Sequence, residues 1–111
     1  MQIQEVKWSK SEFMAYVLFY AAQADFQEST AEKTLIHSKV SDDVYERMHA
    51  EIDRDNDYQR IQKIDLYVKS NNFSEQQIDD LIAEIHELFV SDDSYGVIEQ
   101  SMELSLRKIL K

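Results

Sequence analysis

Two acidic segments, at positions 24–32 and 91–99, hold the side chains best suited to chemistry in this chain. In each, a small residue and an aspartate follow a strongly apolar stretch, and a glutamate lies seven positions after the aspartate. Carboxylate oxygens arranged in this way are the ligands that hard divalent cations prefer. We therefore predict a divalent-metal site of unspecified identity. Its candidate ligands are Asp25, Glu28, Glu32, Asp92, Asp93 and Glu99.

A purely structural interpretation of the same residues stays open. Ser29 and Glu32 have the spacing of a capping box, in which the two side chains satisfy backbone amides at the start of a helix. Asp25 and Asp92 would instead end helices, where the helix dipole disfavours a negative charge, so another group should compensate them. If the two corners form one site, these two aspartates approach each other although 67 positions separate them.

Two other acidic patterns are weaker. The run 53–57 (Asp-Arg-Asp-Asn-Asp) resembles the opening of an EF-hand loop, but Tyr58 and Ile64 occupy the positions that require glycine and a bidentate glutamate. We expect a polar turn in which Asp57 caps the next helix. Glu46 and His49 have the Glu-x-x-His spacing of di-iron bundles, which need two such motifs, and the sequence has one.

Common catalytic motifs are missing from the sequence. Gly96 is the only glycine, so glycine-rich phosphate loops are excluded, and the absence of cysteine excludes thiolate nucleophiles and zinc–thiolate sites. His37 and His86 flank apolar stripes and are expected at the boundary between core and solvent. We predict that the protein is not an enzyme.

The elements that would position these residues are helices. With no proline, one glycine and many Leu, Ile, Glu and Lys residues, the chain favours helices joined by short polar corners. Capping-box spacing recurs at Ser9 and Glu12, and at Ser74 and Gln77. We predict an all-α fold, a compact bundle of about six helices in a single domain (1–111). The expected helices are 10–25, 30–39, 42–54, 58–69, 75–90 and 96–110.

The apolar pattern ranks these helices by burial. Helix 10–25 is apolar on nearly all sides, which is typical of the centre of a bundle. Helix 75–90 has the clearest single apolar stripe, with apolar residues repeating every three or four positions. That stripe contains Ile78, Leu81, Ile82, Ile85, Leu88 and Phe89.

The two acidic corners, taken with the helix order, resemble the TerB-like group, the tellurite-resistance protein B fold that also occurs as a domain of the co-chaperone DjlA. The stretch from Tyr16 to Glu32 matches the first corner of that family, and the stretch from Leu88 to Glu99 matches the second. The family's glycine after each aspartate is replaced here by Phe26 and Asp93. The resemblance implies a non-enzymatic helical bundle that holds a divalent cation at its paired corners, in a stress or tellurite-resistance context.

Charge and hydropathy limit the partners. The formal net charge of −10 disfavours binding to nucleic acid or to anionic membranes, and favours cations or a basic protein partner. The longest apolar run, 13–22, is too short to cross a membrane, and the first residues do not resemble a signal peptide. A cytoplasmic location of bacterial type is expected. The alternative function is an acidic interaction or scaffold domain without a metal.

Overall fold

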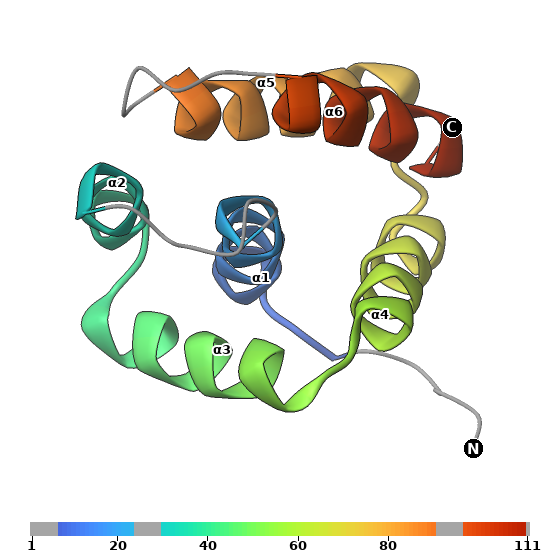
Figure 1. Ribbon diagram of the computed structural model, residues 1–111. Helices are drawn as coiled ribbons and strands as arrows, with labels where there is room; N and C mark the ends of the chain where they lie inside the picture. The colour runs from blue at the N-terminus through green and yellow to red at the C-terminus, as the bar shows by residue number, and fades with distance from the viewer. Residues whose placement is uncertain (1–6, 24–29, 91–96, 111) are drawn as a thin grey trace.

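The computed structural model describes residues 7–23, 30–90 and 97–110, and of residues 97–99 only the backbone. In these ranges the chain forms six helices and no strand, which confirms the all-α prediction (Figure 1). They are α1 (Lys10–Ala22), α2 (Thr30–Lys39), α3 (Asp42–Arg54), α4 (Asp57–Ser70), α5 (Glu75–Val90) and α6 (Val97–Leu110). No helix in this part of the chain is both long and apolar enough to span a membrane.

Side chains that cap backbone amides fix the starts of several helices. At α1 the amide of Glu12 donates to the Ser9 hydroxyl at 3.1 Å, and the Ser9 amide donates to the Glu12 carboxylate at 2.8 Å. Ser74 and Gln77 form the same reciprocal pair before α5. Two of the three capping boxes predicted from serine spacing are therefore confirmed, and each satisfies amides that have no partner inside the helix. The third, at Ser29, lies outside the described residues.

The predicted cap of α4 is wrong. Asn56, not Asp57, is the N-cap: its side chain accepts from the Gln59 amide at 2.8 Å, and Gln59 accepts from the Asn56 amide at 2.9 Å. The position of the cap depends on the residue three positions after it, which must accept a hydrogen bond from the amide of the cap. A cap at Asp57 would place Arg60 there, and a guanidinium has no acceptor for the cap's amide. The first helix also ends earlier than expected, at Ala22 with Gln23 as its C-cap.

Helix α1 lies at the centre of the molecule, with the other helices arranged around it (Figure 1). It packs against α2, α3, α4 and α5, while α6 lies beside α5 and also contacts α4. Eight of its 13 residues are buried, on every side of the helix. The prediction of a central first helix is therefore confirmed, and its physical cause is that no face of α1 is polar enough to meet water.

Helix α5 contributes the second large part of the core. All six residues of its predicted apolar stripe are buried. They join the buried residues of the other helices in one hydrophobic cluster, in which Ile85 and Leu88 are completely inaccessible to solvent. The hydrophobic core and the order of the helices are thus largely those expected from periodicity.

Replacing Ile85 with alanine should lower the free energy of unfolding by about 2–5 kcal/mol, because the smaller side chain leaves a cavity that the core fills only in part. Urea unfolding followed by circular dichroism measures the change. Leu104→Ala is the matched control, since Leu104 is 64% exposed and its truncation should cost less than about 0.5 kcal/mol. Equal effects of the two changes would contradict the packing of α5 described here.

Candidate functional site

Most of the predicted metal ligands lie outside the described residues. Asp25 and Glu28 belong to segment 24–29, and Asp92 and Asp93 to segment 91–96. Glu99 lies in the first turn of α6, where only the backbone is described. Whether the two acidic corners approach each other therefore stays a prediction. Among the described residues, no group of three or more metal-ligating side chains is gathered in one place.

Glu32 is the one predicted ligand whose side chain is described. It lies in the first turn of α2 and is 4% exposed, which makes it the one buried charged residue in the described ranges. Burying a carboxylate is costly unless hydrogen bonds or a positive charge compensate it. The start of a helix offers such compensation through its free amides and its dipole. The Glu32 side chain therefore lies within the fold, away from bulk solvent.

The carboxylates of the acidic turn between α3 and α4 contact separate protein groups. Asp53 lies 3.5 Å from the His49 imidazole, Asp57 lies 3.5 Å from Arg60, and Asp55 accepts two other hydrogen bonds described below. Each carboxylate thus has its own protein partner. These contacts agree with the expected polar turn.

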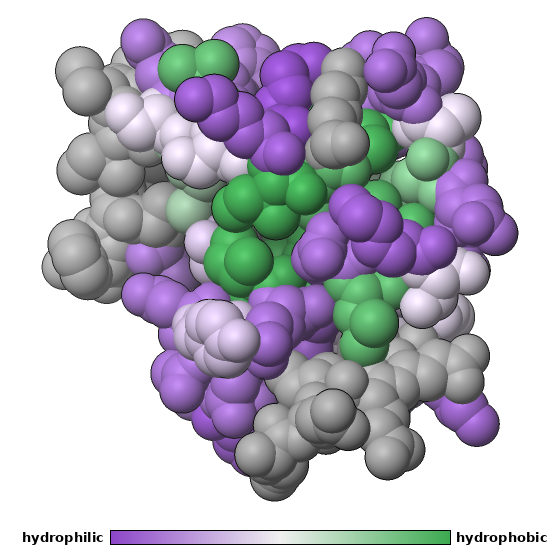
Figure 2. Space-filling model, turned by 90° about the vertical axis from the view of Figure 1, so that its right-hand side faces the viewer, coloured by the Kyte–Doolittle hydropathy of each residue, from purple (hydrophilic) through white to green (hydrophobic). Residues whose placement is uncertain are grey.

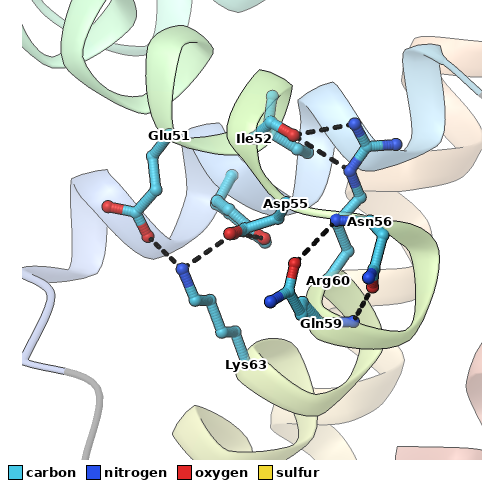
Figure 3. A network of polar contacts seen from close by, with 8 residues as sticks. Glu51, Ile52, Asp55, Asn56, Gln59, Arg60 and Lys63 are labelled. Carbon is cyan, nitrogen blue, oxygen red and sulfur yellow. Dashed lines mark hydrogen bonds and ion pairs between the residues drawn. The ribbon is translucent and has the colours of Figure 1, made fainter. Parts of the chain in front are cut away.

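Asp55 is the centre of a partly buried polar network (Figure 3). Its carboxylate accepts a hydrogen bond from the Tyr16 hydroxyl at 2.6 Å and from the Lys63 ammonium at 2.8 Å. Lys63 also reaches Glu51 at 3.2 Å, and Arg60 donates twice to the Ile52 carbonyl near the end of α3, at 3.0 and 2.7 Å. The network fastens α1 and α4 to the C-terminal end of α3.

A tyrosine, an aspartate and a lysine in contact could in principle transfer protons, but this arrangement is unsuited to catalysis. The Tyr16 side chain is fully buried, so a substrate cannot reach it. Burial raises the pKa of Tyr16 far above its ordinary value, and its hydrogen bond to the negatively charged Asp55 raises the pKa further. A tyrosine of this kind keeps its proton at neutral pH. We therefore assign the network a structural role.

A row of three rings joins α2 to α3. The His37 and Tyr45 rings are stacked with centroids 3.6 Å apart, and the Tyr45 and His49 rings are parallel at 6.0 Å. Phe19 of α1 packs edge-on against both Tyr45 and His49. His37 is nearly half exposed, as expected for a boundary residue. The row packs one side of the bundle and gathers no metal-binding cluster.

One hollow in the described part of the chain lies on the side of the molecule formed by α4 and the ends of α5 and α6. Figure 2 views this side and shows hydrophobic residues uncovered near its centre, with hydrophilic residues around them. A cleft of about 270 Å³ lies here, which we term the α4–α6 cleft. Its apolar wall consists of Val68, Phe73, Ile78 and Leu110, and its polar rim of Lys69, Asn72 and Glu75.

The end of α4 builds the lower part of this cleft. The amide of Phe73 donates to the Val68 carbonyl, and the amide of Asn72 donates to the Lys69 carbonyl, both at 3.2 Å. Asn72 has φ of +52°, the one positive φ at a non-glycine residue in the described ranges. These are the features of a Schellman motif, which also brings Phe73 against Val68. Asparagine tolerates this left-handed conformation better than most residues.

Sequence reasoning missed the α4–α6 cleft. A usable local signal existed, since Asn72 after the apolar pattern of α4 is typical of a helix C-terminus. Leu110 and Ile78, in contrast, reach the cleft only through tertiary packing. The charged residues that line the cleft are Lys69 and Glu75.

Raising pH above about 10 should reduce stability through Tyr16. The unfolded chain loses the phenol proton near pH 10, whereas the native protein keeps it because burial raises the pKa of Tyr16. The native state then binds more protons, so its stability falls as pH rises. In urea unfolding between pH 9 and 11, Tyr16→Phe should make this decline shallower by up to about 1.4 kcal/mol per pH unit. The control Tyr58→Phe, at a 69% exposed position, should keep the wild-type slope; identical slopes for all three proteins would contradict the assignment.

Comparison of this chain with models of protein families, with curated proteins and with solved structures gave no match.

Proposed function

We propose that this chain is a non-catalytic helical module that binds a protein partner, and that the α4–α6 cleft receives an apolar side chain of that partner. The observation that carries the proposal is the apolar lining of the cleft, which consists of the partly exposed Phe73 and the nearly buried Val68, Ile78 and Leu110. We take this partly apolar hollow on a strongly acidic protein as the surface for the interaction.

The size of the cleft supports a protein partner over a small molecule. Sites for small organic ligands usually measure about 300–1,000 Å³ and enclose most of the ligand. At about 270 Å³ and open to solvent, the α4–α6 cleft is below this range and suits one or two side chains. Anchor side chains that enter such pockets provide much of the binding energy in protein interfaces. A contact of this size implies a weak or transient complex.

Selection from a random peptide library displayed on phage tests this proposal. Selected peptides should bind at the cleft and shift the methyl resonances of Val68, Ile78 and Leu110, with Leu104 on the outer face of α6 as the internal control. Val68→Phe should reduce binding at least ten-fold by occupying the hollow. Ser70→Phe adds the same bulk to an exposed position of the same helix and should have little effect.

Thermal melts of both variants establish that they fold, and the methyl resonances of the wild type give a result that needs no variant. If peptides are selected but shift resonances elsewhere, or if no peptide binds with millimolar affinity or better, the α4–α6 cleft is not a binding site.

A second candidate function is favoured by the burial of Glu32. We propose that the TerB-like corners hold a divalent cation, with Glu32 completing a ligand set supplied by Asp25, Glu28, Asp92, Asp93 and Glu99. The resemblance of both corners to that family supports this idea, as does the 4% exposure of a carboxylate beside the first corner. A cation would compensate both the buried charge and the aspartates that follow helices.

Calorimetric titration with Ca²⁺, Mg²⁺, Mn²⁺ and Zn²⁺ distinguishes this candidate. One ion should bind and raise the melting temperature, since binding to the native state alone stabilises it. Glu32→Gln should weaken binding at least ten-fold, and the double change Asp25→Asn, Asp92→Asn should abolish it without loss of helix. Glu46→Gln, at an exposed position of α3, is the control. No heat with any of the ions at millimolar concentration, or unchanged heat in Glu32→Gln, removes the metal hypothesis.

A further inference from the structure

The charges around the α4–α6 cleft restrict what can enter it. The rim carries one positive residue, Lys69, and one negative residue, Glu75, together with the neutral Asn72. The Lys69 ammonium is already engaged: it lies 3.1 Å from the Asp65 carboxylate and 3.5 Å from the Leu110 carbonyl. The positive charge of the rim is therefore balanced by the protein itself.

Glu75 is in a different position. It is exposed, it is the first residue of α5, and within the described chain its carboxylate has no hydrogen bond or ion pair. An acidic residue in the first turn interacts favourably with the helix dipole, so its presence there has a local benefit. It nevertheless leaves one negative charge without a side-chain partner among the described residues at the rim of the cleft. An incoming cationic group would find this carboxylate available.

The charge of the whole chain points in the same direction. With 22 acidic and 12 basic residues, the protein attracts basic partners over long range and repels copies of itself. Charge complementarity of this kind sets association rate and specificity more than affinity. It also argues against a second copy of the chain as the occupant of the cleft.

We propose that the α4–α6 cleft binds a basic protein segment, which places one apolar side chain against Phe73, in the hollow also lined by Val68, Ile78 and Leu110, and a lysine or arginine beside Glu75. This inference rests on the proposed interaction function and adds the chemistry of the partner to it. Glu75 then determines which segments bind, because its carboxylate attracts a basic residue beside the apolar anchor and repels an acidic residue there.

The experiment compares charge-reversed pairs. A peptide from the phage selection should carry a basic residue next to its apolar anchor, and its dissociation constant is measured by fluorescence anisotropy. Changing that residue to glutamate, or making Glu75→Lys in the protein, should each weaken binding about two- to five-fold, as expected for an exposed ion pair. Combining the two changes should restore much of the affinity, because opposite charges face each other again.

Asp42→Lys is the matched control. Asp42 is also the first residue of its helix, α3, which lies on the opposite side of α1 from α5 (Figure 1). The same charge reversal there should leave peptide binding within the error of measurement, and binding to the wild type should weaken between 0.05 and 0.5 M salt.

The outcomes separate the two proposals. If no peptide binds at the cleft, the interaction function itself fails. If peptides bind at the cleft but lack a basic bias, or if Glu75→Lys and Asp42→Lys affect them equally, the basic-segment inference is wrong while the interaction function stands. If sedimentation shows self-association that Val68→Phe abolishes, a second copy occupies the cleft and the inference is overturned.

Discussion

An α-helix that is apolar on every side can be kept from water only when other helices surround it, and this constraint governs the fold. Helix α1 has buried residues around its whole circumference, so α2, α3, α4 and α5 must all contact it. Each of these needs only one apolar stripe, because one face meets α1 and the other meets solvent. In this arrangement the charged side chains that the structure describes, except that of Glu32, are directed outwards.

Polar contacts then fix the angles at which the surrounding helices are held. Lys39 at the end of α2 pairs with Glu84 of α5 at 2.7 Å, and Arg107 of α6 pairs with Asp79 of α5 at 2.6 Å. The network around Asp55 joins α1, α3 and α4. Exposed pairs of this kind contribute little to stability. The partly buried contact between Tyr16 and Asp55 contributes more, since a carboxylate left without its hydrogen bonds there would be costly.

Local rules predicted much of this architecture. The bounds of α2, α3 and α5 agree with periodicity and serine caps, and the first helix was expected at the centre because of its composition. The error at α4 was itself local, because Gln59 three positions after Asn56 identifies the correct cap. The hydrogen bond from Tyr16 to Asp55 could not be predicted, since 39 positions separate the two residues and no pattern records their proximity. The same is true of Leu110 in the α4–α6 cleft, whereas the acidic corners remain predictions because they lie outside the described residues.

The central position of α1 has a consequence for the synthesis of the protein on the ribosome. Helix α1 precedes in the chain every helix that covers it, and 68 residues separate its last residue, Ala22, from Val90 at the end of α5. At synthesis rates of about 5–20 residues per second, adding them takes roughly 3–14 s. During that time α1, the most apolar helix of the protein, has left the ribosome, or is leaving it, before the last of the helices that cover it is complete. The nascent chain is therefore most exposed to aggregation, and most in need of chaperones, before α5 is complete.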